Sequence, residues 1–196
     1  MAKVVADMSM SLDGFVADPH DGVGELFGWY GNGDVVLPTA DPDITFRVSE
    51  ASADHLRPAF TGGIGALLTG RRLFDIAGGW GGRHPVGAPV FVVSHSVPQS
   101  WPREDSDTTF HPDAIGALEA AKKAAGDRIV AVATPTLTRQ YLDAGLLDEI
   151  VVSLTPVLLG SGIPFFSGLG RTPVRLGDPR VVAGKGVTHL TYPVLR

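Results

Sequence analysis

Two adjacent arginines at the start of a helix are the first feature of the sequence that points to chemistry. The apolar run 64–69 has the length of a buried strand and leads into Gly70, Arg71 and Arg72. The positive end of a helix dipole disfavours an exposed cation by about 0.3–1 kcal/mol, and a bound anion would offset this cost. The turn therefore predicts a phosphate site. The alternative is that the arginines lie in solvent or pair with Asp75 and a neighbouring carboxylate.

A cluster of small polar residues ends the next predicted strand. The apolar run 89–94 leads into Ser94, His95 and Ser96. Their hydroxyl and imidazole groups suit a second phosphate or a ribose. Taken alone, the same three residues would be an ordinary capped turn.

A second strand-to-helix turn follows the apolar run 128–133. Thr134 is a residue type that favours the N-cap position, and Pro135 is pre-shaped for the first helical position. Helix starts of this kind present unpaired N–H groups and a partial positive charge at the carboxyl ends of parallel strands. The sequence therefore predicts two anion-binding turns at one edge of a sheet.

The first predicted strand, residues 3–12, has one apolar and one polar face. Apolar residues alternate with Asp7, Ser9 and Ser11, and the polar face leads to Asp13. Asp13 therefore either faces a bound ligand or forms, with the glycine that follows it, a simple turn.

A stretch rich in glycine, aspartate and proline, residues 18–42, is too long for an ordinary connection. We expect it to be a lid or to be disordered. Trp29 and Tyr30 lie within it, where they would either stack on a flat substrate or serve as a local hydrophobic anchor or an interface patch.

The remaining pattern defines the elements that must position these residues. Further strands are predicted at 149–156, 174–183 and 187–194, and helices at 49–60, from Arg71, at 112–126 and from Pro135 to about Ala144. Because strands and helices alternate in the middle and a hairpin closes the chain, we expect an α/β fold. Its architecture is a three-layer α/β/α sandwich with a mixed, mostly parallel sheet and a C-terminal antiparallel hairpin, in one domain over residues 1–196.

Composition narrows the function further. The net charge is −5 with scattered lysines and arginines, which disfavours a nucleic-acid partner. There is no cysteine, no histidine spacing typical of zinc sites, no G-x-S-x-G elbow and no G-x-G-x-x-G fingerprint, so no metal site is predicted. Without a membrane-length apolar run or a signal-peptide core, we expect a cytoplasmic protein that does not bind membranes.

The order and spacing of these turns resemble the dihydrofolate reductase-like superfamily, in particular the reductase domain of bacterial riboflavin biosynthesis. The resemblance spans most of the chain and is carried by the segments 11–15, 29–30, 68–74, 92–94, 140–150 and 156–166. It implies NADPH as hydride donor and a C=N or C=O group of a small, pteridine- or pyrimidine-like molecule as acceptor. It also implies a homodimer.

The resemblance assigns roles to individual residues. Asp13 would face the nicotinamide or the substrate as the one nearby candidate acid, with a bound water as the alternative proton source. The substrate would contact Ser11, Trp29 and Tyr30. Residues implied to line the cofactor are Thr69, Gly70, Arg71, Arg72, Ser94, His95, Ser96, Ala133, Thr134 and Thr136.

One departure from the family pattern leaves a second function open. Most relatives carry two glycines where this chain has Ala133 and Thr134, because glycine lets the backbone approach a pyrophosphate closely. Pro135 also removes one N–H donor from the helix start. The alternative to a reductase is therefore a non-catalytic protein that binds a nucleotide or another small ligand and keeps the reductase fold.

Overall fold

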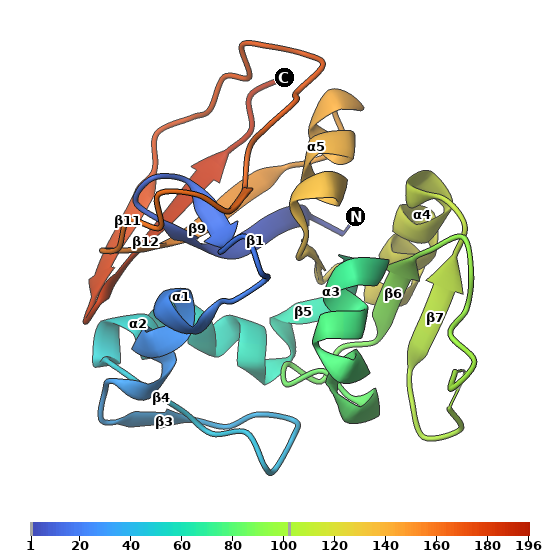
Figure 1. The fold of residues 1–196 in the computed structure, drawn as a ribbon, viewed down its shortest axis with the longest axis horizontal. Helices are drawn as coiled ribbons and strands as arrows, with labels where there is room; N and C mark the ends of the chain where they lie inside the picture. Colours follow the sequence, from blue (N-terminus) through green and yellow to red (C-terminus); the bar gives the residue numbers. More distant parts are fainter. Residues whose placement is uncertain (1, 102) are drawn as a thin grey trace.

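An eight-stranded sheet forms the centre of the protein, which we describe from a computed structural model covering residues 2–101 and 103–196 (Figure 1). The strand order is β11-β12-β9-β1-β8-β5-β6-β7. The strands are β1 (Val4–Ser11), β5 (Ile64–Gly70), β6 (Val90–Val93), β7 (Thr108–His111), β8 (Ile129–Val132), β9 (Glu149–Thr155), β11 (Arg180–Gly184) and β12 (Val187–Pro193).

The strand directions confirm the predicted mixed sheet. The six strands from β9 to β7 pair in parallel, whereas β12 runs antiparallel to β9 and forms a hairpin with β11. The strand predicted at 174–183 is much shorter than expected, because before β11 only Leu176 contributes, as an isolated bridge to Val194. The edge strand β7 was not predicted, since its four residues alternate too briefly to show a pattern.

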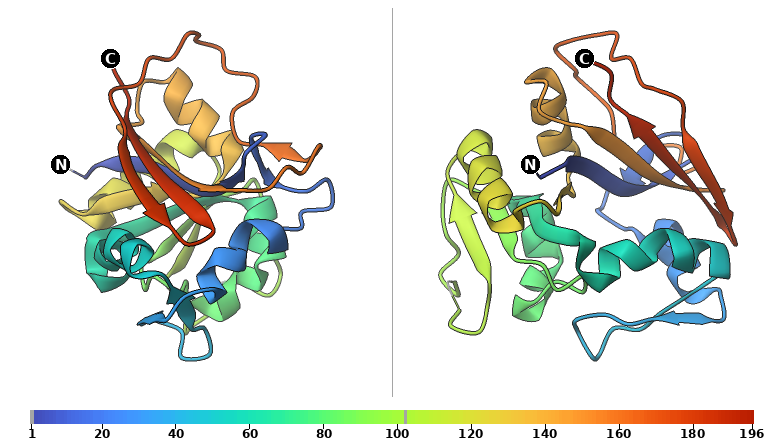
Figure 2. Two further views of the ribbon diagram at one scale, coloured as in Figure 1. Left: turned by 90° about the vertical axis from the view of Figure 1, so that its left-hand side faces the viewer. Right: turned by 180° about the vertical axis from the view of Figure 1, so that it is seen from behind.

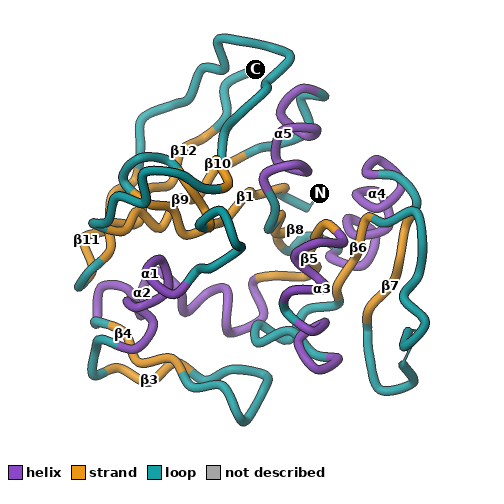
Figure 3. Tube along the Cα trace, viewed as in Figure 1, coloured by secondary structure: helices purple, strands orange, loops and turns teal. Residues whose placement is uncertain are grey.

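Helices cover both faces of the sheet, as Figures 2 and 3 show. One face packs against α4 (Ala114–Ala125) and α5 (Pro135–Asp143) around Val4, Ala6, Leu68 and Val132. Tyr141 of α5 is fully buried, and its hydroxyl donates a 2.7 Å hydrogen bond to the carbonyl of Ala114 in α4. The two helices are therefore joined to each other as well as to the sheet.

The other face of the sheet carries two separate apolar clusters. One, around Leu67, Phe74 and Val92, is covered by α3 (Arg71–Ile76). The other, around Trp29, Leu56 and Val187, is covered by α2 (Glu50–Pro58). The polar face of β1 lies between these two clusters in the strand order.

The segment 18–42 is ordered, which corrects one of the two alternatives, a disordered stretch, while the lid stays a prediction. It contains α1 (Gly24–Phe27), a 3₁₀ turn at Gly28–Gly31, and β3 (Val35–Leu37), which pairs with β4 (Phe46–Val48). Trp29 and Leu37 are 3% and 1% exposed, respectively. Burial of these two side chains holds the segment against the rest of the protein. The many turn-forming residues of the segment give no indication of this burial in the sequence.

A second small sheet joins the first turn to a late loop. There β2 (Phe15–Ala17) pairs with β10 (Ile163–Pro164). A Cβ atom on Gly162 would overlap the carbonyl oxygen of Ala17, so glycine is required at this position. Among the helices of the described residues, none has the length and apolar character needed to cross a bilayer.

Candidate functional site

The carboxyl ends of β5, β6 and β8 bring most of the predicted cofactor residues together. These three strands are neighbours, and Gly70 at the end of β5 lies beside Val93 at the end of β6. From the first position of α3, Arg71 donates through Nη1 to the carbonyl of Ser96 at 3.1 Å and to the Ser96 and Ser94 hydroxyls at 3.2 and 3.4 Å. The two turns predicted separately therefore form one polar cluster.

Both arginines are paired with carboxylates, which is the alternative that the sequence left open. Arg71 Nε lies 2.8 Å from both carboxylate oxygens of Asp75, one turn along α3. Arg72 Nη2 lies 2.7 Å from Asp21, which raises the pKa of the guanidinium. Because both ion pairs are solvent-exposed, each stabilises the protein only weakly. An anion that binds to the arginines would therefore displace the carboxylates at a small cost in free energy.

Thr134 faces Gly70 across the gap between the two helix starts. It is the N-cap residue of α5, followed by Pro135 at the first helical position as predicted, but its side chain makes no capping hydrogen bond. Its hydroxyl oxygen is buried and has no hydrogen-bond partner among the described residues. A Cβ atom placed on Gly70 would lie 3.7 Å from the Thr134 side chain, so this hydroxyl lies between the two turns.

A buried hydroxyl without a partner is unfavourable unless a ligand satisfies it. The hydroxyl therefore fits a phosphate oxygen at the place where the family pattern has glycine. Ala133 is partly buried, packs against the Phe74 cluster and donates its N–H to the carbonyl of Leu68. The first turn of α5 also carries Thr136, which is exposed.

Two predicted cofactor residues lie at the margins of this cluster. Thr69 is fully buried, and its hydroxyl lies 3.3 Å from the carbonyl oxygen of Gly70. His95 is exposed between the two serines. Thr69 therefore packs inside the protein beneath the turn, whereas His95 lies on the surface.

Asp13 holds two loops together. Its carboxylate accepts hydrogen bonds from the Ser11 hydroxyl at 2.6 Å and from the N–H groups of Leu159 and Gly160 at 3.1 and 2.7 Å. The Ser11 hydrogen bond is the main cause of a lowered pKa of Asp13. An ionised carboxylate with these partners is suited to anchoring the late loop to the first turn, and its role as an acid stays a prediction.

Trp29 and Tyr30 have the arrangement of a local anchor. Trp29 is buried, its indole N–H donates to the Ser9 hydroxyl at 3.3 Å, and its ring stacks on that of Tyr30 at 3.8 Å. Tyr30 also packs against Phe46. Because its neighbours cover the Trp29 ring, a substrate would meet the Tyr30 side of this pair.

Asp7 is a functional candidate that the sequence reasoning did not single out. It lies in the interior of β1, and burial raises the pKa of its carboxyl to about 6. Within the described residues no hydrogen bond or ion pair holds this carboxyl, and it keeps partial access to solvent. The available signal was a carboxylate in the middle of an otherwise apolar or hydroxyl-bearing strand.

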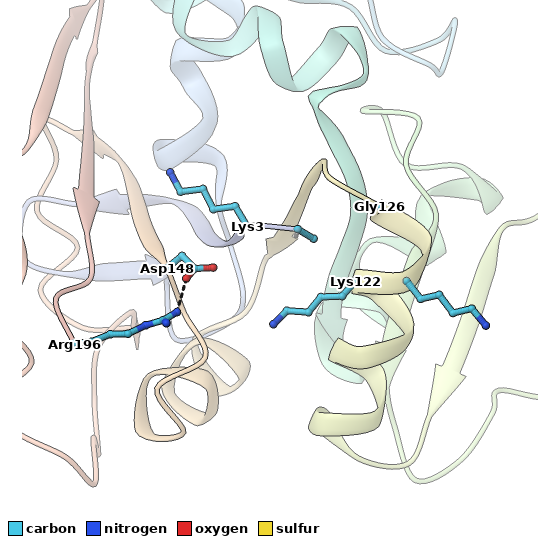
Figure 4. A pocket seen from close by; sticks show the side chains of 7 residues that line it. Lys3, Lys122, Gly126, Asp148 and Arg196 are labelled. Carbon is cyan, nitrogen blue, oxygen red and sulfur yellow. Dashed lines mark hydrogen bonds and ion pairs between the residues drawn. The ribbon is translucent and has the colours of Figure 1, made fainter.

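The surface has one hollow near this site and another far from it. A hollow of about 240 Å³ is lined by Asp18, Glu25 and Leu159, beside the loops that Asp13 joins. A larger hollow of about 600 Å³ lies between Lys3, Lys122 and Arg196 (Figure 4). Lys3 and Asp148 directly precede β1 and β9, so the larger hollow is at the opposite edge of the sheet from the two turns.

Four cations and one carboxylate line the larger hollow, and two of the cations form ion pairs. Arg196 pairs with Asp148 at 2.8 Å, as Figure 4 shows, and Lys3 pairs with Glu149 at 2.6 Å. Lys122 and Lys123 leave the hollow with an excess of positive charge, but it lies at the amino ends of β1 and β9, away from the two turns. Across the described parts of the chain, no cluster of His, Asp and Glu is arranged to hold a metal ion.

Solved structures and a curated relative show what this chain is similar to. Over their full lengths it is 25% identical to a Shewanella sp. PV-4 protein with a provisional riboflavin biosynthesis name, with a TM-score of 0.71. It is 26% identical over 203 residues to the uncharacterized protein YyaP of Bacillus subtilis (strain 168), covering 97% of this chain and 94% of the relative.

More distant structures share the fold. RibD of Acinetobacter baumannii is 14% identical with a TM-score of 0.65, and the match covers 100% of this chain and 58% of that chain. Dihydrofolate reductase from Enterococcus faecalis, solved with NADP(H), is 12% identical with a TM-score of 0.56, covering 99% of this chain and 97% of the reductase. The RibD C-terminal domain family itself matches residues 83–189, more than half of the 196 residues. The chain belongs to the family of the RibD C-terminal domain, and its fold is that of the dihydrofolate reductases.

Proposed function

We propose that this protein is an NADPH-dependent reductase that transfers hydride to a C=N or C=O group of a small, pteridine- or pyrimidine-like molecule. The observation that carries the proposal is the cluster between the two helix starts, where Arg71 contacts Ser94 and Ser96 and the Thr134 hydroxyl has no partner. Cations, hydroxyl groups and free helix N–H groups at the carboxyl ends of parallel strands suit a phosphorylated ligand. Family membership adds the reductase chemistry.

The chain's own residues would bind and orient the two reactants. Arg71 and the two serines would hold a phosphate at the β6 side, and Thr134 with the first turn of α5 would hold another at the β8 side. The cofactor, when bound, supplies the hydride. The acceptor would lie over the polar face of β1, between the two apolar clusters. A side chain on that face would supply the proton that the reduction needs.

The same proposal includes a homodimer in the cytoplasm. Leu12, Leu158 and Phe166 are 62%, 68% and 41% exposed on segments that hydrogen bonds join to one another. A second copy of the chain would cover such an apolar surface.

The role of Arg71 tests cofactor binding directly. In a fluorescence or calorimetric titration we expect wild-type protein to bind NADPH, and Arg71→Ala to weaken NADPH by about 10–100-fold, because a hydrogen bond to a charged group contributes about 1.5–3 kcal/mol. NADH should be weakened less if the arginine holds the extra phosphate. The exposed Arg57 on α2 provides a matched control, and Arg57→Ala should bind like wild type. Wild-type protein that binds neither nucleotide would overturn the proposal.

The unpartnered hydroxyl of Thr134 gives a second test. Thr134→Val keeps the side-chain shape and removes the buried hydroxyl, so the free energy of unfolding should stay the same or rise by up to about 1 kcal/mol. NADPH affinity should fall by about tenfold, because a phosphate would lose one hydrogen bond. Urea unfolding and the same titration measure both quantities. A stability loss with unchanged affinity would show that the hydroxyl has an internal role only.

A non-catalytic binding protein remains the second candidate function. It is favoured by Ala133 and Thr134, which stand where glycines would let the backbone approach a pyrophosphate. A protein of this kind would fail to respond to NADPH and NADH in the titration above while binding another anionic ligand at the same cluster.

A further inference from the structure

Asp7 lies at the divide between the two halves of the candidate site. In the sheet register Ala6 lies opposite Val132, the last residue of β8, so Asp7 is level with the turn that leads to Thr134. The apolar partners Val4 and Ala6 belong to the cluster under α4 and α5. Strand alternation, together with the bond from Trp29 to Ser9, places Asp7 on the opposite face. Its side chain therefore lies on the face that bears the two separate apolar clusters.

The surroundings of Asp7 explain its unusual chemistry. Burial is the cause of its raised pKa, which is about 6, and no neighbouring cation or N–H group compensates the charge. The titratable group that interacts with it is Tyr30 of the 3₁₀ turn at Gly28–Gly31, whose own pKa is raised by burial and by the Asp7 charge. A buried carboxyl without a hydrogen-bond partner lowers the stability of the fold. A role in stabilising the fold therefore does not explain the presence of Asp7 at this position.

From this position we propose that Asp7 is the proton donor of the reduction and that the acceptor is a C=N group. The inference rests on the proposed function. Hydride from the nicotinamide forms a new C–H bond at the carbon as the C=N double bond opens, and the nitrogen takes the proton of the Asp7 carboxyl. The products are the oxidised nucleotide, a C–H and N–H bond in the substrate, and an Asp7 carboxylate that regains its proton from solvent.

A C=N acceptor fits this acid better than a C=O acceptor. An acid that titrates near neutral pH transfers its proton efficiently to a nitrogen of comparable basicity, whereas a carbonyl oxygen is far less basic. The carboxylate form also attracts the positive charge of a protonated imine. Asp13, with three hydrogen bonds to its carboxylate and a lowered pKa, stays ionised and is therefore a poor proton donor.

The test compares Asp7→Asn with wild type in two measurements. The first follows the side-chain carboxyl carbons by NMR between pH 4 and pH 8 without ligand, and the signal missing in Asp7→Asn identifies Asp7. The second measures NADPH oxidation with two cyclic imines, 7,8-dihydrofolate and 2-methyl-1-pyrroline. We expect the Asp7 signal to titrate near pH 6, and kcat to fall by about 10²–10⁴-fold in Asp7→Asn with unchanged NADPH affinity. Asp7→Glu should recover part of kcat and keep an acidic break in the pH profile.

Matched controls separate the possible failures. Asp54→Asn changes an exposed carboxylate on α2 and should behave like wild type, while Asp13→Asn tests the competing acid. An Asp7 signal that titrates near pH 4, or full turnover by Asp7→Asn, would overturn the assignment of Asp7 while NADPH binding still supports the reductase. Absence of NADPH binding by wild type would instead remove the proposed function, whatever the Asp7 titration shows.

Discussion

Phe74→Ala is expected to lower the free energy of unfolding by about 3–5 kcal/mol, as for other large buried aromatic residues. Phe74 is 1% exposed, and its ring packs against Trp101, Phe110 and Trp80 with ring centres 4.9, 5.2 and 6.3 Å away. The glycine-rich turn at Gly78–Gly82 lies directly beside this ring, since a Cβ atom on Gly79 would approach it to 2.9 Å. The variant should be at the margin of folding at 37 °C.

Urea unfolding followed by circular dichroism measures this loss. Ile76→Ala on the same helix is the matched control, since Ile76 is 52% exposed and its truncation should change stability by no more than about 0.5 kcal/mol. Because α3 also carries Arg71, Phe74→Ala should weaken NADPH binding in whatever fraction stays folded. A loss below about 1 kcal/mol would contradict the packing described for this cluster.

Acid is expected to destabilise the protein between pH 6.5 and pH 4, through the buried imidazole of His189 and the partly buried imidazoles of His55 and His84. His189 is completely buried, with its ring nitrogens 3.0 Å from the Ser153 hydroxyl and 2.9 Å from the Ser52 hydroxyl. Its ring stacks on that of His55 at 4.3 Å, and His55 lies 3.3 Å from Arg180. Burial, above all, lowers the pKa of both histidines to about 4.

The sign of the effect follows from these pKa values. The folded state favours the neutral imidazole, so this stabilisation is complete above pH 6.5 and is lost as the pH falls toward 4. Asp7 acts in the opposite direction, because its raised pKa favours folding at low pH and this contribution is lost between pH 3.8 and about 6. His84, whose pKa burial also lowers to about 4, adds to the loss from His189 and His55. Three imidazoles therefore oppose one carboxyl, and we expect a net loss of several kcal/mol from pH 7 to pH 4.

Urea midpoints measured between pH 7.5 and pH 4 check this expectation. His189→Asn should be less stable at pH 7.5, because it disturbs two buried hydrogen bonds, and its stability should depend less on pH. His20→Gln, an exposed control, should keep the wild-type profile. Asp7→Asn should show a steeper acid loss than wild type, because it removes the opposing contribution. A flat wild-type profile would contradict the burial of the His189 and His55 pair.

The regular elements that support the site were predictable from sequence alone. Strands β1, β5, β8 and β9 and helices α4 and α5 lie within a few residues of their predicted positions, because each shows either a regular period or an unbroken apolar run. The two strand-to-helix turns were also predictable, since Gly70 and Pro135 mark them by local backbone preference. The order of these strands, helices and turns along the chain predicted both the mixed sheet and the family.

The tertiary structure decided which side chains meet. The pairs of Arg72 with Asp21 and of Asp13 with Gly160 join residues far apart in the chain, so no local pattern contains them. The burial of Trp29 and the order of the segment 18–42 depend on packing against α2 and β12. The raised pKa of Asp7 likewise needs the low-dielectric surroundings that only the folded chain supplies. The sequence alone was therefore enough to predict the edge of the sheet where the two turns lie. Only the long-range packing shows that Asp7 is buried and that Asp13 is held by hydrogen bonds, and this difference makes Asp7 the candidate acid.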